Sequence, residues 1–140
     1  MAAGYSGTPL LQKLGIKPAM KVKLISEPAD YYTLLNADIS QQLCKPGETP
    51  DLVHLFVTGA ASLEREMKKL EAVYQKNPAL QIWVSWYKKS FLQSQGKPTG
   101  ELTEDTIRNY ALQNGLVDVK VCAVSNAWSG LKLVVPLAKR

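Results

Sequence analysis

Two adjacent lysines with tryptophans nearby are the residues of this sequence best suited to holding a negatively charged ligand. Lys88 and Lys89 follow the segment "WVSWY", and Trp128 lies within "SNAWSG". Ammonium groups attract anions, and aromatic rings can form the walls of a ligand pocket. We therefore expect an anion site that combines these side chains with polar residues brought to them by the fold. The candidate ligand-binding residues are Ser6, Thr8, Ser26, Glu27, Thr58, Trp86, Lys88, Lys89, Asn126, Trp128 and Ser129.

The same residues also fit an interpretation without a ligand. In it, Lys88 and Lys89 are solvated loop charges, and Trp128 covers one end of the core. Glu27 and Asp30 could form a carboxylate pair, but acids at the start of a helix already stabilise the helix dipole. Both interpretations stay open at the level of the sequence.

No set of catalytic residues stands out. His54 is the only histidine, and its apolar surroundings favour a hydrogen-bonded core residue over a general base. Cys44 and Cys122 are far apart and match no metal-ligand spacing, so we expect two reduced, buried thiols. The sequence has no Walker loop, serine elbow or HExxH motif. We therefore predict no catalytic residue, metal or cofactor.

Five apolar segments that predict β-strands must position the candidate residues. The predicted strands are 20–25, 52–57, 80–86, 117–124 and 131–135. Several are apolar on both faces, which is typical of a sheet covered by helices on both sides. Between them the sequence predicts helices at 28–35, 62–75 and 103–115. Because strands and helices alternate as far as residue 124, the first four strands should be parallel.

The short segment "SNAWSG" predicts a hairpin, which makes the fifth strand antiparallel to the fourth. We expect one α/β domain over residues 1–140, a three-layer sandwich with a mostly parallel sheet and an antiparallel final strand. The expected strand order is 1-2-3-5-4, which is methyltransferase-like, with room for a short edge strand near 39–45. Ligands bind at the carboxyl ends of the strands in such sheets, so the candidate residues should gather there.

The segment after the first strand lacks the glycines of a nucleotide or S-adenosylmethionine site. It reads "ISEPADYY", and Pro28 removes a backbone donor. Residues 26–51 are also too few for two crossover units, one of which would carry a ribose-binding acid. The sequence therefore argues against an ordinary methyltransferase, although fold alone does not fix function.

The glycines of "GYSGTPLLQKLGIK" precede the first strand, so they are not a phosphate loop of this fold. Thr8 is predicted to cap a helix, with Pro9 as its first residue and Gly15 as its stop. Residues 4–8 are then predicted to form a lid near the ligand edge, where free N–H groups could hold an anion. The polar segment 87–101 is predicted to be a long loop.

The net charge of +5 arises from 17 basic and 12 acidic residues, and only three of the basic residues are arginines. Nucleic-acid binders usually carry a denser basic stripe, so we do not expect nucleic acid as a partner. No apolar stretch is long enough to span a membrane, and no secretory signal is visible. These features predict a cytoplasmic location and leave the oligomeric state open.

Several segments together resemble the bacterial family called domain of unknown function 3052. They are "GYSGTPLLQKLGIK", "DLVHLFVT", "WVSWYKKS", "LTEDTIRNYALQNGLVDVKVCAV" and "WSGLKLV". The resemblance covers almost the whole chain in order and implies a small bacterial protein without an assigned activity. Members often have Trp-Pro-Lys-Lys after the third strand and a shorter loop there, whereas this chain has Tyr87 at the second position. The resemblance transfers no site residue.

Our leading hypothesis is a non-enzymatic or degenerate methyltransferase-like module. It would bind a small anionic ligand or a protein partner at the carboxyl edge of the sheet. One alternative is a methyltransferase with an atypical S-adenosylmethionine site. A second alternative is a structural or protein-interaction domain that uses the 62–75 helix or an exposed sheet edge.

Overall fold

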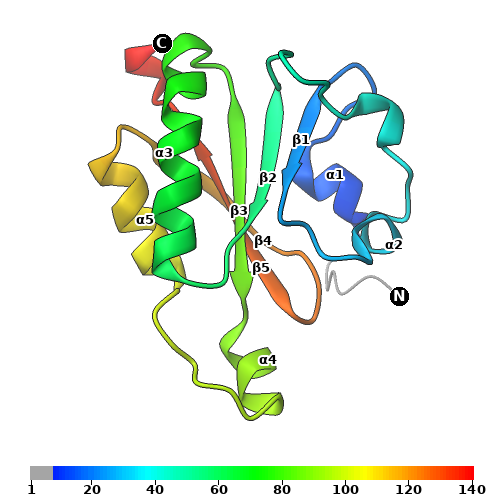
Figure 1. Ribbon diagram of the computed structural model, residues 1–140, viewed down its shortest axis with the longest axis vertical. Helices are drawn as coiled ribbons and strands as arrows, with labels where there is room; N and C mark the ends of the chain where they lie inside the picture. The colour runs from blue at the N-terminus through cyan, green and yellow to red at the C-terminus, as the bar shows by residue number, and fades with distance from the viewer. Residues whose placement is uncertain (1–7) are drawn as a thin grey trace.

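A five-stranded sheet forms the middle layer of the computed structural model, which describes residues 8–140 (Figure 1). The strands are β1 (Val22–Ile25), β2 (Leu52–Phe56), β3 (Gln81–Tyr87), β4 (Val117–Ala123) and β5 (Trp128–Val134). Their order is β1-β2-β3-β5-β4. β1, β2 and β3 are parallel, and β5 lies antiparallel between β3 and β4. The predicted fold class and strand order are confirmed.

Helices cover both faces of this sheet. On one face lie α3 (Ala60–Lys76) and α5 (Glu104–Gln113), and on the other lie α1 (Leu10–Leu14) and α2 (Tyr31–Leu35) (Figure 1). Alternate residues of the central strands point to opposite faces, as the two-residue period of a strand requires. In β2, for example, Val53 and Leu55 join the core under α3 and α5, whereas Leu52 and Phe56 join the core under α1 and α2.

The last strand begins three residues earlier than the predicted 131–135. Trp128 and Ser129 are therefore strand residues rather than turn residues, and the hairpin connection is shorter than "SNAWSG". Gly130 is also inside β5, where a Cβ atom would lie 3.1 Å from Val124 and 3.3 Å from Trp83. This glycine is explained by close packing against Trp83 and not by a turn.

Two other segments differ from the expected pattern. The short edge strand near 39–45 is replaced by the 3₁₀ helix η1 (Ser40–Gln42) and one isolated bridge between Leu43 and Val22. The predicted loop 87–101 contains helix α4 (Lys89–Ser94), which projects beyond the carboxyl end of β3 (Figure 1). A second 3₁₀ helix, η2 (Leu137–Lys139), follows β5.

The start of α1 also corrects a prediction. Pro9, not Thr8, occupies the N-cap position, and the Pro9 carbonyl accepts hydrogen bonds from the N–H groups of Gln12 and Lys13. Proline suits this place because it has no N–H to leave unpaired. Gly15 ends the helix in the left-handed conformation, with φ 75°, as predicted. Ser6 and residues 4–7 of the predicted lid lie outside the described residues.

The predicted cap of α5 is confirmed and allows a test. Thr103 Oγ1 accepts a hydrogen bond from the N–H of Thr106 at 3.1 Å, which satisfies one of the free donors of the first turn. We expect Thr103→Ala to lower the free energy of unfolding by about 1 kcal/mol. Urea unfolding followed by circular dichroism measures this, with Thr49→Ala in an exposed loop as the control. Equal losses in both variants would contradict the role of the cap.

The described residues include neither a membrane-spanning helix nor a cluster of metal ligands. Between residues 8 and 140, no helix combines the length and the apolar character needed to cross a bilayer. Within the same residues, no three His, Cys, Asp or Glu side chains gather where they could hold a metal ion.

Candidate functional site

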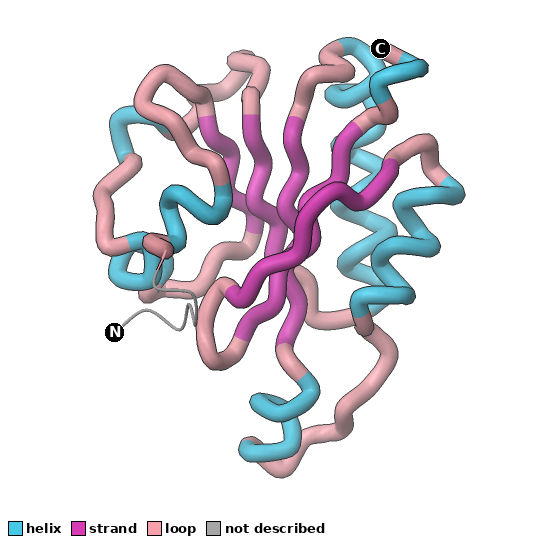
Figure 2. The backbone as a smooth tube through the Cα atoms, turned by 180° about the vertical axis from the view of Figure 1, so that it is seen from behind, coloured by secondary structure: helices cyan, strands magenta, loops and turns pink. Residues whose placement is uncertain are grey.

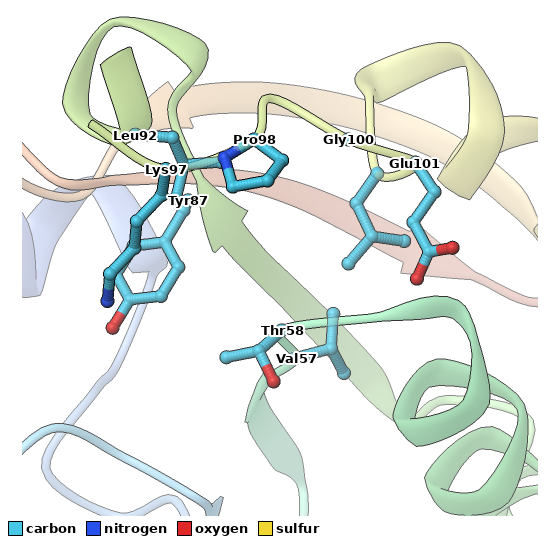
Figure 3. A pocket seen from close by; sticks show the side chains of 9 residues that line it. Val57, Thr58, Tyr87, Leu92, Lys97, Pro98, Gly100 and Glu101 are labelled. Carbon is cyan, nitrogen blue, oxygen red and sulfur yellow. The ribbon is translucent and has the colours of Figure 1, made fainter. Parts of the chain in front are cut away.

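A cavity of about 650 Å³ opens at the carboxyl ends of β2 and β3, at the edge where the sequence predicted a ligand (Figure 3). Val57 and Thr58 lie on one side of it, and the segment that leaves α4 passes over the other. We call it the β2–β3 pocket. It is lined by Val57, Thr58, Tyr87, Leu92, Lys97, Pro98, Gly100, Glu101 and Leu102. Its walls are thus mainly apolar, with a few polar groups.

A carboxylate fastens the segment over the pocket to the start of α3. Glu101 Oε1 accepts a hydrogen bond of 2.9 Å from the N–H of Ala60, the first residue of that helix. The N-cap residue, Gly59, has no side chain to satisfy this donor, and a Cβ there would lie 3.1 Å from Glu101 Oε1. The negative charge also suits the positive end of the helix dipole. Glu101 therefore holds one rim of the pocket in place.

Aromatic stacking fixes the opposite wall. The Tyr87 ring stacks on Trp128 with a centroid distance of 3.9 Å and on Phe91 with 5.1 Å. Trp128 in turn meets Phe56 edge to face at 4.9 Å. Because Tyr87 is held between two rings, its phenol has a fixed position at the β2–β3 pocket.

A second cavity, of about 320 Å³, also has Tyr87 in its wall. Asn126 and Trp128 line it, together with Asp30 and Phe91. The two cavities share Tyr87, so they are neighbours along the same edge of the sheet. Asn126 and Trp128 are therefore two predicted site residues that one cavity brings together.

Trp86 and Trp128 do not form two walls of one pocket. Trp86 is buried in the core under α3 and α5, whereas Trp128 belongs to the core under α1 and α2. The reason is the strand register, in which Trp86 is paired with Ser129 and Tyr87 with Trp128. Tyr87, which is not among the candidate ligand-binding residues, therefore takes the place expected for Trp86.

The two lysines predicted to bind an anion, Lys88 and Lys89, do not line the β2–β3 pocket. Lys88 precedes α4, where its N–H donates to the carbonyl of Ala127 at 2.8 Å, and Lys89 is the exposed first residue of α4. Neither is among the residues that line the pocket, whereas Lys97 is. Lys97 follows α4, and the chain returns after this helix so that the Lys97 ammonium group lies at the pocket.

The segment after β1 lies apart from the pocket. Ser26 is exposed and has a φ of 59°, so a serine adopts the left-handed conformation that glycine usually takes. Glu27 lines a third cavity, of about 340 Å³, with Tyr31 and Tyr32. Burial, with a smaller contribution from the charge of Glu27, raises the pKa of Tyr31 far above its ordinary value.

His54 is buried in the centre of β2, as predicted, and joins a chain of hydrogen bonds. Its Nδ1 lies 2.8 Å from Tyr31 Oη, and its Nε2 lies 2.7 Å from Ser85 Oγ. Burial lowers the pKa of His54 to about 3, so the ring is neutral, with one nitrogen that donates and one that accepts. The three side chains are fully or almost fully buried, so this group is part of the core and not a reactive site.

The two cysteines differ from expectation in burial. Both are free thiols, but each is partly exposed rather than buried. Burial raises the pKa of each thiol above its ordinary value, which disfavours the reactive thiolate.

The side chains that line the β2–β3 pocket are suited to binding a small molecule. The lining residues include no histidine or cysteine, and the carboxylate of Glu101 is engaged with Ala60. What they offer is apolar surface, one ammonium group from Lys97 and the hydroxyls of Thr58 and Tyr87. Such a set can hold and orient a small molecule.

Comparison with known proteins identifies the fold. No family model matches the chain, and no curated protein matches it either. Among solved structures, similarity is found to a protein of the NADB-Rossmann superfamily from Streptococcus agalactiae. The TM-score is 0.53 at 10% identity, over 91% of this chain and 68% of that one.

Two methyltransferases are similar to a comparable degree. The ribosomal protein L11 methylase of Lactobacillus delbrueckii subsp. bulgaricus has a TM-score of 0.53 at 14% identity, over 90% of this chain and 74% of that one. A candidate type 11 methyltransferase from Sulfolobus solfataricus has a TM-score of 0.52 at 14% identity, over 96% and 94%. At such identities the likeness establishes a methyltransferase-like Rossmann fold and no activity.

Proposed function

We propose that this chain is a non-enzymatic or degenerate methyltransferase-like module that binds a small organic anion in the β2–β3 pocket. The observation that carries the proposal is the pocket itself, at the carboxyl ends of two parallel strands. Its volume of about 650 Å³ is in the range of small-molecule sites. Open α/β sheets bind their ligands at this edge.

The lining residues indicate the kind of ligand. Leu92, Leu102 and Val57 favour an apolar body, while Lys97 supplies the one ammonium group among the lining residues. The Glu101 carboxylate already meets the positive end of α3, so the attraction for an anion comes from Lys97 and, at longer range, from the net charge of +5. A carboxylate or phosphate attached to a flat or aliphatic group fits these walls.

Removal of the Lys97 ammonium is expected to weaken the binding of such an anion. A thermal-shift screen of nucleotides and acidic metabolites would supply the ligand, and titration calorimetry would give the dissociation constants. We expect Lys97→Ala to raise the dissociation constant about fivefold, because an exposed charge contributes at most about 1 kcal/mol. Lys68→Ala, an exposed lysine of α3, is the matched control and should have no effect.

Two results would count against this proposal. One is a screen without a single stabilising anion. The other is a ligand whose affinity is the same for Lys97→Ala and the unaltered chain. A ligand that instead responds to Lys88→Ala/Lys89→Ala would move the site to the start of α4.

A methyltransferase with an atypical cofactor site is the second candidate, favoured by the methyltransferases among the similar structures. Against it stands the segment after β1, where no glycine is present and Ser26 alone takes a positive φ. Calorimetry with S-adenosylmethionine separates the two candidates. Binding that is competed by S-adenosylhomocysteine would favour the enzyme, and its absence at millimolar cofactor would favour the binding module.

We also propose that the chain is related to the family called domain of unknown function 3052. The relation rests on the sequence segments quoted above, such as "WVSWYKKS". A structure of one member with the order 1-2-3-5-4 and a pocket between its second and third strands would support it. A family member with a different topology would contradict the proposed relation.

A further inference from the structure

Four lysines gather on one face of the sheet, away from the β2–β3 pocket. Lys120 of β4 is paired directly with Lys132 of β5, and the Lys120 ammonium group donates to the carbonyl of Lys13 in α1 at 3.0 Å. Lys17 lies near enough for its charge to act on Lys132. We call Lys13, Lys17, Lys120 and Lys132 the lysine cluster.

The lysine cluster opposes local stability. Like charges directly opposite each other in an antiparallel pair repel. No carboxylate of residues 8–140 forms an ion pair with any of the four side chains. Partial burial, followed by the charges of Lys120 and Lys17, lowers the pKa of Lys132 below its ordinary value. A local conflict of this kind is typical of a surface that meets a partner of opposite charge.

The cluster lies beside a strand edge without a neighbour. Among the described residues β4 pairs with β5 alone, so the outer N–H and C=O groups of β4 have no strand partner. The backbone trace of β4 and β5 can be followed in Figure 2, and α1 reaches β4 on this face through the contact of Lys13 with Lys120. An unpaired edge can accept a further strand.

Apolar side chains are exposed on the same strand. Val121 is 52% exposed and is paired with Leu131, so it belongs to the α5 face, opposite the lysines. Val119 is 55% exposed and lies where the register shifts between Asp118 and Lys120. This irregularity divides the pairing of β4 with β5 into two parts, Val117 to Asp118 and Lys120 to Ala123. The edge thus offers positive charge on one face and apolar surface on the other.

We propose that the outer edge of β4 binds an extended acidic segment of a partner protein, which adds a strand to the sheet. In the bound segment, acidic side chains face the lysine cluster and alternate with apolar side chains that face Val121. The two-residue period of a strand produces this alternation directly. The partner is therefore a peptide with acidic and apolar residues at alternate positions.

Two other occupants fit less well. A second copy of this chain paired through β4 would bring one lysine cluster next to another, and the charges would repel. A nucleic acid would contact the lysines, but it would form neither strand-type hydrogen bonds with the main chain of β4 nor apolar contacts with Val121. The cluster also lacks the arginine forks and stacking rings that favour phosphates and bases.

Fluorescence anisotropy with a labelled peptide of alternating glutamate and valine tests the proposal. Three controls are used: a peptide of the same composition with its glutamates and valines in separate blocks, a peptide N-methylated at alternate residues, and an oligouridylate. We expect the alternating peptide to bind, with an affinity that falls as salt is added. N-methylation should weaken binding at least tenfold, because it removes main-chain donors without a change in charge.

Variants of the chain locate the site. Lys17→Glu/Lys120→Glu should weaken binding of the alternating peptide about tenfold or more. Lys68→Glu/Lys76→Glu, on the exposed side of α3, makes the same change in charge and should have little effect. Lys97→Ala should also leave this binding unchanged, which separates it from the β2–β3 pocket. If the first variant does not fold, the N-methylated peptide on the unaltered chain decides.

Several outcomes would overturn the proposal. The first is that the alternating peptide fails to bind at low salt, or that the blocked or N-methylated peptide binds as tightly. The second is that the oligouridylate binds more tightly than the peptide and that its binding responds to the same lysine variant. The third is a dimer, detected by light scattering, that Lys17→Glu/Lys120→Glu strengthens, as relief of repulsion across a β4–β4 pair would do.

Discussion

Replacement of His54 by leucine is expected to lower the free energy of unfolding by about 3 kcal/mol. The imidazole joins Tyr31 Oη and Ser85 Oγ, at 2.8 and 2.7 Å, within a core that excludes water. Leucine fills much of the space but leaves two buried hydroxyls without a partner. Each such group costs about 1 to 3 kcal/mol. Urea unfolding followed by tryptophan fluorescence measures the loss.

Companion variants distinguish lost hydrogen bonds from lost packing. Tyr31→Phe removes one hydroxyl and should cost less than His54→Leu. The triple variant Tyr31→Phe/His54→Leu/Ser85→Ala removes all polar partners together and should recover part of the stability, because no buried hydroxyl is left unpaired. A triple variant less stable than His54→Leu would show that packing, and not hydrogen bonding, dominates at this position.

The second large effect is a loss of stability in mild acid. Burial lowers the pKa of His54 to about 3 in the folded chain, against about 6.5 when unfolded. Below the unfolded value, the unfolded chain binds a proton that the folded chain does not, so stability falls as the pH falls. Between pH 7.5 and pH 5 the loss should reach about 2 kcal/mol. The loss of stability is fully absent only at a pH well above the pKa of His54 in the unfolded chain.

This pH window isolates His54 because the chain has no other histidine and ordinary carboxyl groups titrate lower. Urea unfolding curves at pH 7.5, 6.5, 5.5 and 5 give the profile. His54→Leu should make it nearly flat over the same range, even though the variant is less stable throughout. A profile that is equally steep in the variant would assign the acid sensitivity to other groups.

The strand directions could be predicted from the sequence because the connections determine them, whereas the place of β5 between β3 and β4 was predicted from the resemblance to the methyltransferase-type fold. Helical segments between the first four strands require parallel neighbours, and a connection as short as that after β4 requires an antiparallel one. The burial of His54 followed from its place in the apolar run "LVHLFV". Its partners did not follow, because Tyr31 and Ser85 reach it from other parts of the chain.

The candidate site was predicted less well because it depends on register and on one short helix. With β5 assigned to start at Leu131, nothing indicated that Tyr87 would pair with Trp128 and leave Trp86 in the opposite core. The polar segment after β3 lacks the apolar period of a long helix, so α4 was not predicted. Without α4, the sequence did not predict that Lys97 would lie at the carboxyl edge of the sheet, although it did predict a ligand site at that edge.

The central claim is that a small organic anion binds between β2 and β3. Two-dimensional NMR of the ¹⁵N-labelled chain, titrated with the acidic compounds of the thermal-shift screen, tests it most directly. The account predicts saturable shifts of the amide signals of Thr58, Tyr87, Gly100 and Glu101, all at the rim or wall of the pocket. If no compound moves these signals at millimolar concentration, or if the shifts lie only along β4, the claim is contradicted.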